Sequence, residues 1–254
     1  MFDVVIRNGL VVDGTGAPGR IVDVAVKDGR IVAVGEVSES GISEVDAQGL
    51  VVAPGFVDVH THFDAQVFWD TTLSPSPLHG VTTVISGNCG FTIAPLEPEH
   101  GDYMMQMLAR VEGMPLTSLQ QGVPWNWRTF GEYLDAIDGS LMPNAGFLVG
   151  HSALRRTVMG ERSVGEFASD DELQAMKDLL AESIEAGGLG FSSSWAKTHN
   201  DADGDAVPSR HASQRELVEL CAVLKDTPAV ALEFIPTIER FDNEVYQLLT
   251  DMSV

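Results

Sequence analysis

The sequence predicts an α/β protein in which a small antiparallel sheet precedes a larger region built on a parallel sheet. Residues 1–53 consist of short, β-branched runs separated by pairs of turn residues, which is typical of hairpins. After Pro54, apolar strands alternate with longer segments that can form helices, which is typical of β-α units. The length of 254 residues is enough for one α/β barrel or for two smaller domains.

The first region is predicted to form a sheet with two hairpins because turn residues follow its apolar runs. The turn signals are Asn8-Gly9, Asp13-Gly14-Thr15-Gly16 and Asp28-Gly29. Residues 36–45 are polar and are predicted to be a surface connection, after which residues 50–53 return to the sheet. Pro54-Gly55 then breaks the sheet. We therefore expect a β-subdomain at residues 1–54 and a second domain at residues 55–254.

The second region is predicted to be a parallel sheet whose strands are separated by helices. The expected strands lie near residues 56–60, 81–86, 145–150, 188–193 and 229–235. Capping boxes, which fix the start of a helix, are predicted for Thr129 with Glu132, Ser169 with Glu172, and Ser213 with Glu216.

A long insertion separates the second and third expected strands, at roughly residues 92–144, and it is rich in Met, Trp and Pro. A connection of this length usually carries its own helices or has a function. The composition suits a cover over a pocket, and packing against the outside of the sheet is the alternative.

The charge balance limits the classes of partner. The chain has 15 basic and 37 acidic residues, a net charge of −22, which disfavours nucleic acid and anionic membrane surfaces as partners. Two cysteines, Cys89 and Cys221, cannot form a disulfide framework, and the N-terminus resembles no signal peptide. No apolar run approaches the roughly 20 residues of a membrane span. We therefore expect a soluble, cytoplasmic protein.

Three residues predict a metal site. His60 and His62 end the first parallel strand, and their spacing of two places both imidazoles on one face of an extended chain. Cys89 follows the second strand, in the segment 86–90. The carboxyl ends of parallel strands meet at one edge, so the three side chains are expected to converge. Thiolate and imidazole groups are ligands that Zn²⁺ prefers.

Other polar residues near strand ends are further candidates. His151, His199 and Glu233 could contact a metal or the substrate, since each follows or lies in an expected strand. Arg155 could pair with a substrate carboxylate through a bidentate fork. His79 precedes its strand and is expected to be structural.

Several motifs together resemble the amidohydrolase superfamily. They are Val5-Ile6-Arg7-Asn8-Gly9, Val11-Val12-Asp13-Gly14-Thr15-Gly16, Pro54 to His62, and His79 to Val84. Gly87-Asn88-Cys89-Gly90, Phe63-Asp64-Ala65-Gln66, Gly150 to Arg155 and Val207 to Arg210 resemble its branch of D-aminoacylases, the N-acyl-D-amino-acid deacylases.

This resemblance implies a (β/α)₈ barrel of the TIM type, flanked by a β-sandwich built from both termini. It implies zinc held by His60, His62 and Cys89. Asp64, like Arg155, becomes a candidate contact of the substrate. The implied reaction is attack of a metal-activated water on the amide carbonyl, with an aspartate after the last strand as general base. The implied substrate is a small molecule with an amide and a carboxylate.

The sequence also departs from the family pattern. Glu233 stands in the fifth strand, where the resemblance leads us to expect a histidine ligand. Only about five strands of the expected barrel can be counted. The catalytic aspartate is therefore expected beyond Val254. A second chain that completes the barrel, or a homo-oligomer, is considered as a partner. Two other functions stay open: hydrolysis of a cyclic amide, as by dihydroorotases and hydantoinases, and a non-catalytic scaffold that lacks the aspartate.

Overall fold

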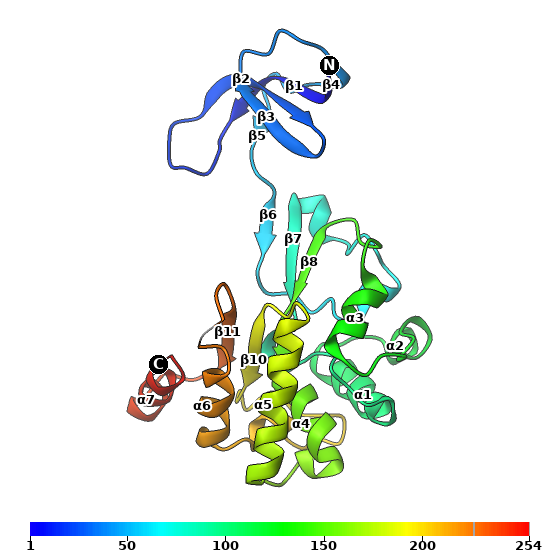
Figure 1. Cartoon of the computed structure of the whole chain (residues 1–254), viewed down its shortest axis with the longest axis vertical. Helices are drawn as coiled ribbons and strands as arrows, with labels where there is room; N and C mark the ends of the chain where they lie inside the picture. Colours follow the sequence, from blue (N-terminus) through cyan, green and yellow to red (C-terminus); the bar gives the residue numbers. More distant parts are fainter. Residues whose placement is uncertain (226, 254) are drawn as a thin grey trace. The chain divides into compact units, whose positions relative to one another are not determined.

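The computed structural model describes residues 1–225 and 227–253 and divides into two compact units, Met1–Phe56 and Val57–Val254. Each unit is described by itself below, with the element labels of Figure 1. No helix in the described ranges combines the length and the apolar character that a membrane crossing requires.

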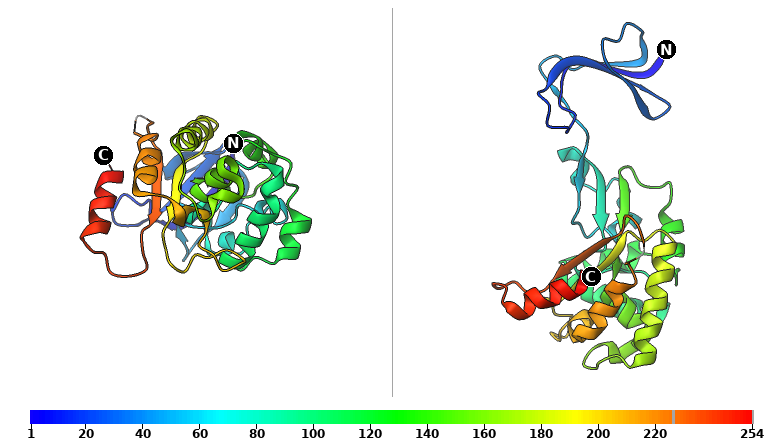
Figure 2. Two further views of the ribbon diagram at one scale, coloured as in Figure 1. Left: turned by 90° about the horizontal axis from the view of Figure 1, so that it is seen from below. Right: turned by 60° about the vertical axis from the view of Figure 1, so that its left-hand side comes forward.

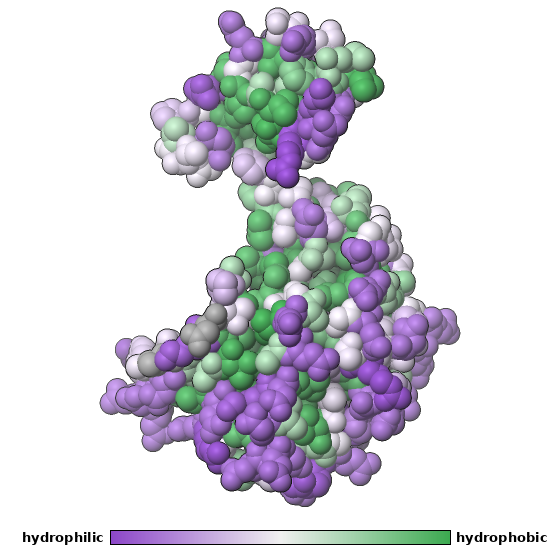
Figure 3. Space-filling model, in the orientation of Figure 1, coloured by the Kyte–Doolittle hydropathy of each residue, from purple (hydrophilic) through white to green (hydrophobic). Residues whose placement is uncertain are grey.

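The first unit is a five-stranded sheet. Its strands are β1 (Phe2–Val11), β2 (Arg20–Lys27), β3 (Arg30–Gly35), β4 (Gly41–Asp46) and β5 (Val51–Val52). The order is β3-β2-β1-β4, with β5 also paired to β1. Asp28 and Gly29 join β2 to β3 with φ values of 50° and 70°, as a type I′ hairpin turn requires. Several apolar side chains of this unit are exposed, and they form part of the apolar surface in Figure 3.

Two predictions for this unit were wrong. The Asn8-Gly9 pair is not a turn: β1 runs through it, and a shift in register between Ile6 and Gly9, with φ of 61° at Asn8, makes it a bulge. The expected surface connection at residues 36–45 contains most of β4, which pairs parallel to β1. The sheet is therefore mixed, since β2 and β3 pair antiparallel while β4 and β5 pair parallel to β1.

The described part of the second unit is α/β, with two three-stranded sheets. One sheet holds β6 (Phe56–Asp58), β7 (Val81–Ser86) and β8 (Asn144–Phe147), and the other holds β9 (Val149–Gly150), β10 (Gly190–Ser194) and β11 (Ala231–Ile235). The pairs β7/β8, β9/β10 and β10/β11 are parallel.

Each predicted strand is found close to its expected bounds, but the strand expected at 145–150 is divided at Leu148 between the two sheets.

Helices follow the strands. They are α1 (Gly101–Val111), α2 (Leu116–Gly122), α3 (Phe130–Ile137), α4 (His151–Met159), α5 (Asp170–Glu185), α6 (Gln214–Ala222) and α7 (Asn243–Met252). Neighbours in the series α4, α5, α6 and α7 pack against one another (Figure 2); α4 contacts the strands β9 and β10, and α5 contacts β9.

Two of the predicted capping boxes are confirmed, those of Thr129 with Glu132 and Ser169 with Glu172. The third was wrong in part. Ser213 caps α6 by accepting the N–H of Glu216, but the Glu216 carboxylate does not return to the cap. It is buried and bonded to Arg155 and His151 instead, because those groups offer it charge-assisted hydrogen bonds inside the core.

The insertion between β7 and β8 carries α1, α2 and α3. Its Met104, Met107 and Trp127 are buried in the main core, where Trp127 Nε1 donates to the Ile93 carbonyl at 2.8 Å. The ring of Phe68 stacks on Trp127 at a centroid distance of 5.0 Å. These three side chains therefore form core rather than the lining of a pocket. The end of α1 nevertheless reaches the candidate site, through Glu112.

Candidate metal centre

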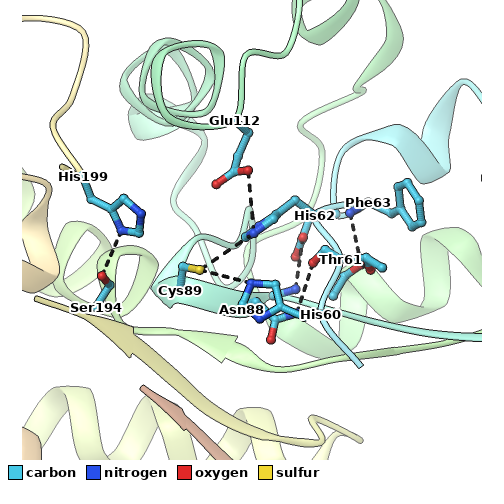
Figure 4. A network of polar contacts seen from close by, with 12 residues as sticks. His60, Thr61, His62, Phe63, Asn88, Cys89, Glu112, Ser194 and His199 are labelled. Atoms are coloured by element: carbon cyan, nitrogen blue, oxygen red, sulfur yellow. Dashed lines mark hydrogen bonds and ion pairs between the residues drawn. The ribbon is translucent and has the colours of Figure 1, made fainter. Parts of the chain in front are cut away.

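His60 and His62 project from the segment that follows β6, with Thr61 facing the other way. Thr61 N–H donates to the Ile85 carbonyl at 3.0 Å, and its hydroxyl lies 2.7 Å from Ser86 Oγ. These bonds fix the extended segment to β7. Because side chains alternate along an extended chain, the two imidazoles share the opposite face, with ring centroids 5.3 Å apart (Figure 4).

A left-handed turn after β7 brings Cys89 to the two histidines. Gly87, Cys89 and Gly90 have φ values of 81°, 59° and 77°. A Cβ on Gly87 would lie 2.3 Å from the Leu148 carbonyl oxygen, so the turn requires glycine there. Cys89 has a left-handed backbone conformation, and its N–H donates to Glu233 Oε2 at 2.7 Å. The cysteine is therefore held in an unusual conformation by a carboxylate from β11.

The three side chains form a compact donor set. Cys89 Sγ lies 3.4 Å from His60 Nε2 and 3.8 Å from His62 Nε2, and all three candidate ligand atoms lie within 4.8 Å of one another. A tetrahedral zinc ion places sulfur and nitrogen ligands about 3.5 Å apart. Burial, and then the charges of His60 and His199, lower the pKa of His62 to about 4, which favours the neutral form that a ligand requires. The residues therefore fit a zinc-type ion.

Two carboxylates border this donor set. Glu112 Oε2, at the C-terminal end of α1, lies 3.6 Å from His62 Nε2 (Figure 4). Burial raises the pKa of Glu112 to about 7. Burial also raises the pKa of Glu233 to about 7, against the lowering effect of the Cys89 N–H. Burial raises the pKa of the Cys89 thiol, and Glu233 and Glu112 add to this. A cation would relieve the cost of ionising all three groups.

His199 lies beside the donor set without belonging to it. Its Nδ1 is 2.9 Å from Ser194 Oγ at the end of β10, and its ring packs on Phe91 at a centroid distance of 5.0 Å. Phe91 in turn lies 6.5 Å from the ring of His62. Burial lowers the pKa of His199, and the charge of Arg210 lowers it further, which favours the neutral ring.

The structure does not bring His151 or Arg155 to the donor set. Arg155 is fully buried, and its Nη1 donates to both carboxylate oxygens of Glu216 at 2.6 Å. His151 is also fully buried, with Nε2 2.8 Å from Glu216 Oε1 and Nδ1 2.8 Å from Ser193 Oγ. Burial lowers the pKa of His151, so the ring is neutral and Arg155 balances the Glu216 charge. These residues join α4 to α6 through the Arg155–Glu216 ion pair and the His151–Glu216 hydrogen bond.

Asp64 supports the turn and is 2% exposed. Its Oδ2 accepts the N–H of Gly87 at 3.1 Å, and its own carbonyl accepts the hydroxyl of Tyr133 at 2.9 Å. Burial raises the pKa of Asp64 to about 7. The side chain expected to contact substrate therefore lies beneath the cysteine turn, where no substrate can touch it without rearrangement.

A cavity of about 340 Å³ adjoins the donor set. His60, Asn88 and Glu233 provide its polar lining, and the rest is apolar. A larger cavity of about 520 Å³ lies around residues 134–147 and is lined by none of the candidate site residues. We assign the smaller cavity to the site because it contains a candidate ligand and a carboxylate.

Sequence reasoning missed Glu112. The residue follows a Met-rich helix inside the insertion and carries no spacing signal that ties it to His62. The only hint was the expectation that the insertion covers a pocket.

The chain is similar to several known proteins. The sequence model of the amidohydrolase family matches residues 43–249. The D-aminoacylase of Alcaligenes xylosoxydans xylosoxydans is 35% identical over 225 residues, covering 88% of this chain and 42% of the relative. A crystal structure of a D-aminoacylase has a TM-score of 0.75 at 34% identity, covering 99% of this chain and 48% of that one.

A second solved structure is an N-acyl-D-glutamate deacylase from Bordetella bronchiseptica, complexed with zinc and a phosphonate inhibitor. Its TM-score is 0.74 at 30% identity, and the match covers 98% of this chain and 48% of that one. The chain thus spans less than half the length of these relatives.

Proposed function

The chain belongs to the amidohydrolase family, within its branch of D-aminoacylases, and on this premise we propose that it forms the metal-binding part of a hydrolase. The proposed reaction is zinc-dependent removal of the acyl group from N-acyl-D-amino acids. The observation that carries the proposal is the convergence of two imidazoles and one thiol within 4.8 Å. The relatives named for this activity, and the zinc in one of them, support it.

His60, His62 and Cys89 would hold the ion. A bound zinc ion would supply Lewis acidity and a water molecule with a pKa near 7. Thr61 and Asn88 keep the two ligand segments together, since Asn88 Nδ2 donates to the Thr61 carbonyl at 3.1 Å. Glu233 holds the Cys89 backbone. The substrate amide would lie over the adjoining cavity, whose lining is mostly apolar.

We propose as general base the aspartate that the family resemblance implies. Among the described residues, Glu112 is the carboxylate closest to a proposed ligand nitrogen, at 3.6 Å from His62. We do not assign it as the base, because its contact is with a ligand and not with the adjoining cavity.

We extend the proposal to the fold. The strands β6 to β11 are proposed to be part of a (β/α)₈ barrel, and the sheet of β1 to β5 part of a β-sandwich, with the boundary at residues 54/55. The TM-scores of 0.75 and 0.74 with two deacylases support this assignment.

The test combines metal analysis with a substrate panel. The purified chain should retain zinc after dialysis, and His60→Ala should lose it. His79→Ala, which changes an exposed histidine outside the donor set, is the matched control. The panel contains N-acetyl-D-leucine, N-acetyl-D-aspartate, N-acetyl-D-glutamate, their L-enantiomers and a hydantoin. Equal zinc content in the wild-type chain and in both variants would refute the proposed metal site. Hydrolysis of the hydantoin alone would refute N-acyl-D-amino acids as the substrate class and favour cyclic amides.

A further inference from the structure

The strand β10 is polar although it is buried. All residues of Gly190–Ser194 are buried, and three of the five are serines. A buried strand of a parallel sheet normally carries Val, Ile or Leu, because an unpaired hydroxyl group costs free energy in the core. Each of these hydroxyl groups should therefore have a polar partner, and that partner indicates what the serine does.

The three serines bond to different parts of the second unit. Ser193 Oγ lies 2.8 Å from His151 Nδ1, and Ser194 Oγ lies 2.9 Å from His199 Nδ1. Ser192 is different, because its hydroxyl group has no side-chain partner among the described residues. It bonds to backbone groups instead.

The hydroxyl group of Ser192 contacts both ends of the cysteine turn, residues 87–90. Its Oγ donates to the Gly87 carbonyl and accepts the N–H of Gly90 at 3.0 Å. Ser192 is fully buried, so these two bonds are shielded from water. One side chain of β10 therefore holds the first and the last residue of the turn at a fixed separation.

The cysteine turn requires such support. Cys89 has a φ of 59°, a conformation that a residue with a Cβ keeps only when its surroundings offset the cost. The turn also lies directly on β10, since a Cβ on Gly90 would lie 3.2 Å from Ser193 Cα. The position of the thiol thus depends on the strand beneath it.

Ser192 and Glu233 support the turn from neighbouring strands. They are register partners in the parallel pair β10/β11, so their side chains point to the same face of the sheet. Glu233 Oε2 accepts the N–H of Cys89 at 2.7 Å. Ser192 is the neutral member of this pair, so its loss changes the geometry of the turn without changing the charge beside the donor set. Ser193, the next residue of β10, points to the opposite face.

Resting on the metal site proposed above, we propose that Ser192 is a positioning residue of the metal centre, whose hydroxyl group holds Cys89 Sγ beside the two histidines. The separations to be kept are 3.4 Å from Sγ to His60 Nε2 and 3.8 Å from Sγ to His62 Nε2 (Figure 4). Ligands that are already in place bind an ion more tightly, because less order is lost on binding. Loss of two ordinary hydrogen bonds corresponds to about a tenfold change in affinity.

The test compares Ser192→Ala with Ser193→Ala, the matched control. Both variants lose one buried hydroxyl group from the same strand and keep the charge of the chain, but only Ser192→Ala loses bonds to the cysteine turn. Zinc affinity is measured by competition with a chelator. We expect Ser192→Ala to bind zinc about tenfold more weakly than the wild-type chain, and Ser193→Ala to bind it within about twofold of wild type.

The reactivity of the two cysteines separates positioning from general destabilisation. Alkylation of the metal-free chain by iodoacetamide is followed at each cysteine by mass spectrometry. Cys221 lies in α6 and is 6% exposed, so its alkylation reports opening of the core. Ser192→Ala should speed the alkylation of Cys89 at least about tenfold and leave Cys221 unchanged. Equal acceleration at both cysteines would overturn the positioning role.

Amide hydrogen exchange in the wild-type chain tests the same bond without a substitution. The Gly90 N–H should exchange at least about a hundredfold more slowly than in an unfolded chain, because its bond to Ser192 Oγ must open first. Circular dichroism and the melting temperature check that both serine variants are folded.

Three further results would overturn the positioning role: unchanged zinc affinity in Ser192→Ala, equal loss of affinity in the two serine variants, or unprotected exchange of the Gly90 N–H. Zinc binding that depends on Ser192, in a chain that hydrolyses no N-acyl-D-amino acid, would refute the proposed function and leave the positioning role standing. A wild-type chain that binds no zinc would refute both.

Discussion

Arg155→Met tests whether this arginine binds substrate or stabilises the core. In the structure its Nη1 donates to both oxygens of Glu216, and its Nη2 donates to the carbonyls of Ser163 and Glu166 at 3.2 and 2.7 Å. Methionine fills much of the same volume but makes none of these bonds. Glu216 would then keep only His151 as a partner, while it is 2% exposed.

The expected cost follows from the burial of the pair. Removing one partner of a buried ion pair destabilises a protein by about 3–5 kcal/mol, because the remaining charge is uncompensated. Native domains have free energies of unfolding of about 5–15 kcal/mol, so the loss is a large fraction of the total. With a urea m-value of about 2–3 kcal/mol/M, the midpoint should fall by about 1–2.5 M.

Urea unfolding followed by tryptophan fluorescence measures this shift, since Trp127 is buried in the same core as Leu154. The double variant Arg155→Met/Glu216→Leu should recover at least half of the lost stability, because replacing both charges avoids the unpaired carboxylate. The zinc content and the affinity for N-acetyl-D-leucine of the folded variant should match wild type. A loss of that affinity with unchanged stability would refute the structural role and restore Arg155 as a substrate contact.

Three other predictions follow from local geometry. Gly87→Ala should destabilise the protein by at least about 2 kcal/mol and lower its zinc content, because φ is 81° and the new Cβ would lie 2.3 Å from the Leu148 oxygen. Unfolding curves measure the stability, and metal analysis measures the zinc content. An unaffected zinc content would contradict the proposed role of the turn. Cys89→Ser should weaken zinc binding at least about tenfold, measured by competition with a chelator, since a hydroxyl is a poorer zinc ligand than a thiolate; unchanged affinity would remove Cys89 from the site. Burial raises the pKa of Glu216, but hydrogen bonds and charges from His151 and Arg155 outweigh burial and leave it lowered. This stability contribution is therefore complete above the unfolded pKa of about 4.3 and declines as the pH falls toward the folded value. The Arg155→Met/Glu216→Leu variant should lack that decline in urea unfolding from pH 6 to pH 3, and an identical decline would assign it to other groups.

Local patterns predicted the parallel strands because each is a short apolar run bounded by helix or turn signals. They failed where the outcome depends on a distant partner. Asn8-Gly9 has the composition of a hairpin turn, but pairing of β1 with both β2 and β5 keeps the strand continuous through it. Glu216 has the spacing of a capping box, but Arg155 is 61 residues away in sequence and its effect cannot be read from that spacing.

The same distinction applies to the candidate site. His60, His62 and Cys89 could be brought together from sequence because strand periodicity and the common edge of parallel strands fix their positions. The role of Arg155 could not be predicted, since an arginine that neutralises a buried carboxylate and one that awaits a substrate have the same local sequence. Glu112 could not be predicted because the path of the insertion is set by packing of Met104, Met107 and Trp127 into the core.

The donor set depends on both sheets of the second unit. His60 and His62 follow β6 and Cys89 follows β7, but the turn that carries Cys89 is hydrogen-bonded to two residues of the other sheet. Glu233 in β11 accepts the Cys89 N–H at 2.7 Å, and Ser192 in β10 accepts the Gly90 N–H at 3.0 Å. An ion bound by the three ligands would therefore stabilise the packing of β10 and β11 as well as the turn, because ligand binding to the native state adds to its free energy of unfolding. Glu233 accepts the hydrogen bond of the Cys89 N–H. Through this bond, β11 influences the position of Cys89 in the metal site although it supplies no proposed ligand.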